Sequence, residues 1–340
     1  MSYSSRTIIS VIIPTLNEAE MIGQCLAYLA ASEFPQESLE VIVSDNGSID
    51  ATAEIAASYS DRLKVRVLRN PKINVSALRN LGAHTAEGEI LAFLDADCLV
   101  PPDWLANAVQ LLDLGQGVVI GGHIRIPQDS SWVARAWYGA GYAPKDGEMD
   151  YVPSGNMLMR REIFRAIHGF DENLRTAEDF DLCLRAKRCG FVVRGAARMA
   201  VVHLRTPQSL GEFYKRERWH GTHVTRALFS NIQQWSSFRA VGFALAMLFC
   251  SVGLLAGCVD AISTGRLRLF VAAATLTLAI CSGCAALKLA RRKTRPYWSR
   301  FCQLTVLHLV YGFARARALV SISVDYPRRH VRPNPIAAQG

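Results

Sequence analysis

The first 205 residues alternate short apolar runs with segments whose apolar residues recur at helical spacing. The apolar runs predict buried strands at residues 8–14, 39–44, 65–68, 90–94 and 151–159, with a closing strand pair within 191–203. The helical patterns between them cover residues 19–31, 51–60, 75–85 and 178–189. This alternation predicts an α/β domain whose mostly parallel, Rossmann-like sheet is covered by helices on both faces.

The pattern changes after residue 235, where two long stretches, residues 240–262 and 269–290, are almost free of charged side chains. Each stretch reaches the roughly 20 residues that a helix needs to cross a bilayer. A buried hairpin of a soluble protein is the alternative, but two such stretches joined by a short link favour a transmembrane helical hairpin. A third stretch, residues 301–320, contains His308, Arg315 and Arg317 and predicts an amphipathic helix at the membrane interface.

These patterns predict three parts of the chain. We expect an α/β domain in residues 1–235, a membrane region in 236–325 and a basic, proline-rich tail in 326–340. The aromatic residues between 128 and 147 predict either a partly ordered loop or a short interfacial helix.

The net charge of +9 would suit a nucleic-acid binder, but the basic residues cluster after residue 260, beside the apolar stretches. That arrangement favours anionic lipid headgroups over nucleic acid. Five basic residues follow the second stretch, whereas the link before it contains only Arg266 and Arg268. The positive-inside rule therefore predicts a multi-pass protein of the cell (inner) membrane, with both ends and the α/β domain in the cytoplasm. The nine cysteines show no disulfide or zinc spacing, which indicates a reducing compartment.

The strongest chemical signal is Asp95-Ala96-Asp97, which directly follows the apolar run 90–94. In open α/β sheets, ligands bind beyond the carboxyl ends of the strands. Two carboxylates one residue apart at such an end suit a divalent cation, because Mg²⁺ and Mn²⁺ prefer oxygen ligands and often share the metal with substrate phosphates.

Four further segments accompany this triplet in a fixed order. Residues 11–18 (VIIPTLNE) end the first strand, 43–50 (VSDNGSID) end the second, 78–82 (LRNLG) precede the acidic triplet, and 177–181 (AEDFD) begin a helix about 80 residues after it. Together, the five segments resemble the family 2 inverting glycosyltransferases of the GT-A fold, and the resemblance covers roughly residues 8–205.

The resemblance implies a nucleotide-sugar donor and a Mn²⁺ or Mg²⁺ cofactor. Asp97 would be the primary metal ligand, with Asp95 at the ribose or the metal and His203 as a further ligand, although His203 could equally be a core residue. Asp45 lies where the family recognises uracil, which favours a UDP-linked sugar. The donor-binding residues implied by the resemblance are Pro14, Asn17, Glu18, Asp45, Arg79, Asp95, Gly155, Asn156, Arg218 and Trp219.

Inversion at the sugar carbon requires one base that deprotonates the acceptor hydroxyl. The resemblance assigns this role to Asp179, with Glu178 positioning the base or the acceptor, although acids at a helix start are also favoured by the dipole alone. Lys215-x-x-Arg218-Trp219 resembles the family's Gln-x-x-Arg-Trp motif with Lys in the first position. Arg218 and Trp219 could instead belong to an interfacial belt.

We therefore expect a membrane-anchored hexosyltransferase whose acceptor is lipid-linked, such as a polyprenyl phosphate of cell envelope polysaccharide synthesis. A nucleotidyltransferase is the first alternative, but the segment after the first strand is not a glycine-rich phosphate loop. An inactive membrane scaffold is the second, and it would be expected to lack Asp97 or Asp179. A polymerising synthase would need more spans to form a channel.

Overall fold

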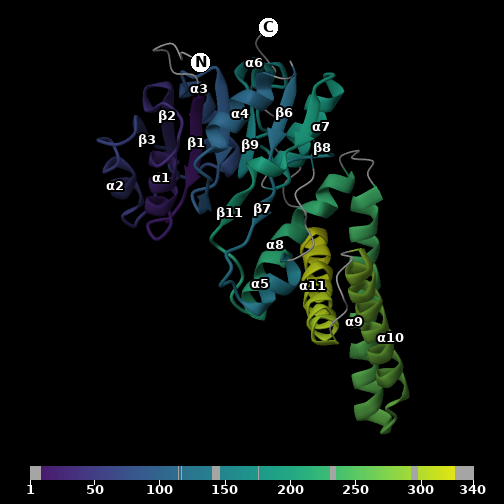
Figure 1. The fold of residues 1–340 in the computed structure, drawn as a ribbon. Coiled ribbons are helices and arrows are strands. Elements are labelled where there is room, and N and C mark those ends of the chain that lie inside the picture. The colour runs from purple at the N-terminus through teal and green to yellow at the C-terminus, as the bar shows by residue number, and fades with distance from the viewer. Residues whose placement is uncertain are drawn as a thin grey trace, which may run out of the picture. The chain divides into compact units, whose positions relative to one another are not determined.

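A computed structural model describes residues 9–113, 115, 117–139, 146–174, 176–229, 235–291 and 298–325 (Figure 1). The expected tail, residues 326–340, lies outside these residues. The chain divides into two compact units, one of residues 1–130 and 142–206 and one of residues 131–141 and 207–340. The units thus divide near residue 206, whereas the sequence predicted a domain boundary at 235.

The first unit is built on an eight-stranded sheet with the order β3-β2-β1-β4-β9-β6-β10-β8. Neighbours β3, β2, β1 and β4 are parallel, β9 is antiparallel to β4 and β6, and β10 is parallel to β6. The strands are β1 (Ile9–Thr15), β2 (Leu39–Asp45), β3 (Val65–Arg69), β4 (Ile90–Leu94), β6 (Val118–Gly121), β8 (Gly147–Glu148), β9 (Asn156–Arg160) and β10 (Val192–Gly195). The prediction of a mostly parallel mixed sheet is confirmed.

Helices cover both faces of this sheet, because alternate residues of its buried strands point to opposite sides. Val11 and Ile13 of β1 pack into one apolar core, and Ile12 between them packs into the other. The first face carries α1 (Ile22–Ala30), α2 (Thr52–Ala57), α4 (Trp104–Asp113) and the 3₁₀ turn η2 (Ala197–Met199). Another 3₁₀ turn, η1 (Gln36–Ser38), leads directly into β2. The second carries α3 (Val75–Thr85), α6 (Arg161–Ala166) and α7 (Glu178–Arg188).

A second, three-stranded sheet lies beyond the end of β4, with the order β5-β11-β7. Its strands are β5 (Cys98–Leu99), β11 (Val201–His203) and β7 (Ile124–Arg125). The predicted strand pair within residues 191–203 is therefore wrong in its pairing: β10 joins the large sheet and β11 the small one, because η2 turns the chain between them.

The second unit is helical. Its members are α5 (Trp132–Trp137), α8 (Leu210–Phe229), α9 (Trp235–Thr264), α10 (Arg268–Arg291) and α11 (Trp298–Asp325). Phe213 of α8, Val133 of α5 and Leu307 of α11 share one apolar cluster, which explains why α8 and α5 group with the later helices. A buried ion pair of 2.8 Å between Arg315 Nη2 and Glu217 Oε2 also joins α11 to α8.

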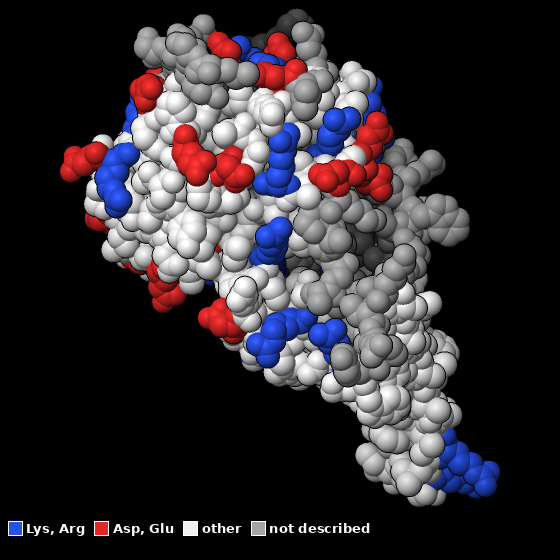
Figure 2. Space-filling model, viewed as in Figure 1, with Lys and Arg blue, Asp and Glu red and all other residues white. Residues whose placement is uncertain are grey.

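Two of the described helices are long and apolar enough to cross a membrane, over Val241–Thr264 and Arg268–Ala290. Apolar side chains on α9 remain exposed at helical spacing, among them Phe249 (71% exposed) and Ile262 (87%). On the face shown in Figure 2, this hairpin is uncharged except for basic side chains at its tip. An exposed apolar stripe of this kind is typical of surfaces that contact another protein or a membrane.

The two helices of the hairpin pack closely at Gly257 of α9. A Cβ atom at this position would lie 2.5 Å from the backbone of Phe270 on α10. Small residues that allow such close approach are typical of helix pairs in membranes.

The stretch 301–320, expected as an interfacial helix, forms the middle of the longer helix α11. Two of its polar residues turn inward within the helical unit: His308 is buried, and the Arg315 guanidinium lies 4.8 Å from the centre of the Tyr311 ring. Arg317 is exposed. An interfacial position for α11 remains a prediction.

Candidate active site

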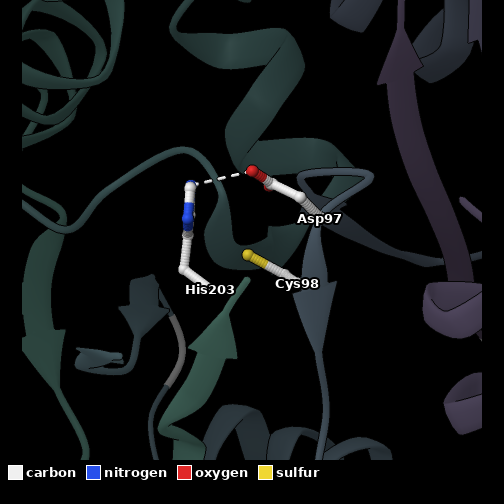
Figure 3. A group of neighbouring side chains, drawn as sticks. All are labelled: Asp97, Cys98 and His203. Atoms are coloured by element: carbon white, nitrogen blue, oxygen red, sulfur yellow. Dashed lines mark ion pairs between the residues drawn. The ribbon is translucent and has the colours of Figure 1, made fainter. Parts of the chain in front are cut away.

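The candidate metal ligands Asp97 and His203 meet at the junction of the two sheets (Figure 3). Asp97 follows the carboxyl end of β4, and β11 returns antiparallel to β5 so that His203 stands opposite Cys98. Asp97 Oδ2 lies 3.3 Å from His203 Nε2, and the Leu204 amide donates a 2.8 Å hydrogen bond to the Asp97 carbonyl. The small sheet therefore brings these two side chains together.

The electrostatics of this pair suit a cation. Burial raises the pKa of Asp97, and the neighbouring His203 opposes that rise. Carboxylate oxygen and imidazole nitrogen are both ligands for divalent metals, with carboxylates preferred by Mn²⁺ and Mg²⁺. The donor set at Asp97 and His203 therefore fits the metal that the sequence predicted.

Asp95 is held by Arg79 of helix α3. Arg79 donates from Nη2 to Asp95 Oδ1 and from Nη1 to Glu178 Oε1, each at 2.8 Å. Its guanidinium is buried and already engaged by these two carboxylates. Arg79 thus fixes the end of β4 to the start of α7, and its place near the diphosphate or base of the donor stays a prediction.

Glu178 and Asp179 open helix α7, as the sequence predicted. Ser154 Oγ donates a 3.0 Å hydrogen bond to Glu178, so this carboxylate is fixed by both Ser154 and Arg79. The residue before them, Ala177, has φ of 60°, in the left-handed region that costs a residue with a Cβ roughly 1–2 kcal/mol. The chain thus keeps a strained position directly before the two acids, as is common at functional sites.

Asp179 is the candidate base. Burial, together with the adjacent Glu178 carboxylate, raises its pKa from the usual 3.8 to about 7. A carboxylate with a pKa near neutrality binds a proton more strongly than an ordinary aspartate and still ionises at physiological pH. These are the properties that general base catalysis requires.

Glu18 forms a second charged pair beside the acidic triplet. Its Oε2 atom accepts a 2.8 Å hydrogen bond from Arg205 Nη2. Burial raises the pKa of Glu18 to about 7, Arg205 opposes the rise, and the nearby Asp97 and Asp95 carboxylates add to it. Carboxylates are thus concentrated here, as expected where a cation binds.

The loops after β1 and β2 interlock through polar contacts. Asn17, with φ of 55°, accepts a 3.0 Å hydrogen bond from the Ile49 amide and donates its own amide to Ser48 Oγ at 2.8 Å. Asp45 is fully buried and accepts hydrogen bonds from Thr15 and Ser48. Pro14 is half-buried near the end of β1. The Asp45 carboxylate is thus engaged by groups of the protein itself. Recognition of uracil by Asp45 stays a prediction.

Gly155 lies against the Asp95 carboxylate, whereas the Asn156 side chain is buried in the protein. A Cβ atom on Gly155 would lie 2.3 Å from Asp95 Oδ2, so only glycine lets this loop approach the carboxylate. The Asn156 side chain is fully buried, where it accepts from Trp104 Nε1 at 3.1 Å and donates to the Met199 carbonyl at 2.6 Å. The Asn156 side chain thus ties β9 to α4 and η2, and a place for Gly155 and Asn156 under the donor sugar stays a prediction.

Replacing Gly155 with alanine should impair the site without unfolding the protein. The added methyl group would push the Asp95 carboxylate away from Arg79, and misplacements of about 1 Å can cost up to ~10²-fold in rate. We expect lower turnover and weaker donor binding, measured by steady-state kinetics. Gly23→Ala on α1 is the matched control, because its Cβ would make only an ordinary 3.5 Å contact with Ile55. Equal activity of the two variants would contradict the role of Gly155.

The structure also identifies residues that the sequence analysis missed: Ser154, Arg205 and Cys98. Each lies within two residues of a predicted site residue, and that proximity was the only signal in the sequence. Conversely, Arg218 and Trp219 are exposed positions of α8 in the helical unit, as is Lys215. They are not among the residues that the first unit brings together.

Comparison with known proteins agrees with this geometry. The family described as "Glycosyl transferase family 2" matches residues 10–167, and "Glycosyl transferase family group 2" matches residues 90–287. Glycosyltransferase AglE of Haloferax volcanii is 31% identical over 264 residues, which cover 74% of this chain and 83% of the relative.

Two solved structures have a similar fold. The mannosyltransferase PcManGT from Pyrobaculum calidifontis, in complex with GDP-Man and Mn²⁺, gives a TM-score of 0.59 at 19% identity, over 94% of this chain and 88% of that one. S. aureus TarS, in complex with UDP-GlcNAc, gives 0.51 at 18% identity, over 94% and 91%. The chain belongs to glycosyl transferase family 2, with the GT-A fold, and is a glycosyltransferase.

Proposed function

We propose that this protein is a membrane-anchored inverting glycosyltransferase that moves a sugar from a nucleotide-sugar donor, with UDP as the expected nucleotide, to a lipid-linked acceptor. The observation that carries the proposal is the connected set of acids in the first unit. Asp97 meets His203 at 3.3 Å, while Arg79 links Asp95 to Glu178, the neighbour of the candidate base Asp179.

In this proposal, each residue has a defined role. Asp97 and His203 hold Mn²⁺ or Mg²⁺, which when bound supplies positive charge for the departing diphosphate. Asp179 accepts the proton of the acceptor hydroxyl as its oxygen bonds to the anomeric carbon. The bond from that carbon to the diphosphate breaks on the opposite face, so the configuration inverts and a nucleoside diphosphate leaves.

The donor can be identified by ligand-induced stabilisation of the detergent-purified protein. A ligand that binds only the native state stabilises it by RT ln(1 + L/Kd), where L is the free ligand concentration, so the melting temperature rises with the logarithm of L relative to Kd. We propose comparing UDP- and GDP-linked sugars in the presence of Mn²⁺, because the structural neighbours hold both types. A selective shift with a GDP-sugar would overturn the expectation of UDP.

The lipid-linked acceptor is supported by the exposed apolar stripe of α9 and by the aromatic residues of α5 and α8. Trp219 of α8 is 52% exposed and Trp132 of α5 is 38% exposed. Tryptophan side chains favour the headgroup level of a bilayer, where a polyprenyl phosphate would present its phosphate. A soluble acceptor would not require such a surface.

Membranes that contain the enzyme should transfer radiolabelled sugar to a product that extracts into organic solvent. The label in the lipid fraction should disappear with Asp179→Asn and persist with Asp181→Asn, a neighbouring acid that pairs instead with Arg185 at 2.7 Å. Label found only on soluble saccharide or protein would rule out the lipid-linked acceptor, while leaving glycosyl transfer itself intact.

We also propose that both termini face the cytoplasm and that the link between α9 and α10 lies outside. The basis is the excess of basic residues after α10 compared with the link. A cysteine at Ser263 should react with a membrane-impermeant thiol reagent in intact cells, once Cys258 and Cys284 are replaced. A cysteine at Gln339 in the same background is the control, and labelling there instead would reverse the orientation.

A further inference from the structure

The side chain of Cys98 lies beside the expected metal ligands. Its sulfur, one oxygen of Asp97 and one ring nitrogen of His203 all lie within 4.8 Å of one another. Figure 3 shows the three side chains converging on one space, Asp97 and Cys98 from consecutive positions and His203 from the facing strand. Cys98 and His203 are partners in the pairing of β5 with β11, and such partners project on the same side of a sheet.

We propose that Cys98 is a third ligand of this centre and makes it a site for thiophilic divalent cations such as Zn²⁺ and Co²⁺. Three protein ligands with oxygen, sulfur and nitrogen donors, plus one open position, match the ligand number of catalytic zinc sites. Thiolate favours Zn²⁺, whereas Mn²⁺ and Mg²⁺ prefer the carboxylate. The same centre would then bind Mn²⁺ through Asp97 and His203 and bind Zn²⁺ or Co²⁺ through all three residues.

The surroundings of Cys98 explain why the sulfur would become a ligand only with a thiophilic metal. The side chain is fully buried and belongs to the apolar core cluster that also contains Cys25 and Val100. Without metal, Cys98 packs there as a small apolar side chain. Zn²⁺ or Co²⁺ binding would form a metal–sulfur bond and release the thiol proton to the solvent.

The functional consequence is a selectivity that the Asp97 and His203 pair alone would not give. A given site of N, O and S ligands generally has a higher affinity for Zn²⁺ than for Mn²⁺. A thiolate ligand increases this difference in affinity. Zn²⁺ should therefore displace Mn²⁺ from this centre. The proposal rests on the metal centre of the proposed function, but it requires neither donor nor acceptor to be present.

The test is Co²⁺ absorption of the detergent-purified full-length protein at one equivalent of metal. Wild-type protein should show both visible ligand-field bands and a near-ultraviolet band from sulfur-to-cobalt charge transfer. Cys98→Ser should keep the ligand-field bands and lose the charge-transfer band. Its affinity for Zn²⁺, measured by competition with a chromophoric chelator, should fall at least about 10–100-fold, the loss seen when even an outer partner of a metal ligand is removed. Its affinity for Mn²⁺ should be retained.

Cys25→Ser is the matched control, because Cys25 is also fully buried and lies near Asp95 and Asp97. It should keep the charge-transfer band. A wild-type protein with ligand-field bands but no charge-transfer band would overturn the role of Cys98 and leave the Asp97 and His203 centre standing. Absence of any Co²⁺ or Mn²⁺ binding would instead contradict the metal centre of the proposed function, and loss of the band in Cys25→Ser would assign the sulfur ligand to Cys25.

Discussion

Asp97→Ala should abolish sugar transfer and remove specific Mn²⁺ binding. Asp97 is the buried carboxylate that stands 3.3 Å from His203, and its removal leaves the centre without its oxygen ligand. Without the cation, the negative charge of the departing diphosphate is not stabilised, and effects of this type are usually the largest in a transferase site. Activity is measured with saturating donor, and Mn²⁺ binding by isothermal titration calorimetry.

Two comparisons make this result specific. Asp103→Ala changes an exposed acid at the start of α4 and should retain both activity and metal binding. Asp95→Ala should weaken donor binding as well as turnover, because it also releases Arg79. Full activity of the wild-type enzyme in excess chelator would refute the metal requirement altogether.

The strands that position the site were predictable because they are continuous apolar runs, which indicate buried strands. All five residues of β4 are buried, and the acids follow directly after them. The two- and three-residue strands of the small sheet have no periodic pattern of their own. Their pairing is decided by tertiary contacts, which is why the sequence could nominate His203 but not show that it meets Asp97.

Side-chain partners were less predictable than residue types. The sequence placed Arg79 and Asn156 near the donor, but it could not indicate that Arg79 is already engaged by Asp95 and Glu178. Nor could it indicate that Asn156 is turned inward to Trp104. Hydrogen bonds between residues far apart in the chain depend on the packed structure. The sequence pattern does not show toward which partner a side chain points.

The second unit begins before residue 235, the boundary predicted from the change of composition, because α8 packs with the later helices. Phe213 shares an apolar cluster with Leu307 of α11, and Glu217 pairs with Arg315. A buried ion pair between two helices is visible only once the helices are placed.

Asp179→Asn should lower turnover by about 10²–10⁴-fold while donor binding remains nearly intact, because loss of a positioned base has this magnitude. The wild-type rate should also depend on pH. With a pKa of about 7, Asp179 is largely protonated at pH 6, so the rate should rise as the pH increases through 7 and then level off. The variant should lose this dependence on pH along with most of its activity.

The stability of the folded wild-type protein should fall as the pH rises, whereas the rate should increase. Comparing the two pH profiles separates a catalytic role of Asp179 from a structural one. The pKa of Asp179 is raised in the folded state from 3.8 to about 7, so the folded protein binds this proton more tightly than the unfolded chain. Its contribution to stability is fully present below pH 3.8 and is lost as the pH rises through 7. Asparagine avoids the buried charge, so Asp179→Asn should melt at a higher temperature than wild type at pH 8, with a smaller difference at pH 6. A variant that is both less active and less stable at pH 8 would mean that Asp179 supports the fold, whereas a loss of donor affinity would place it in the donor site.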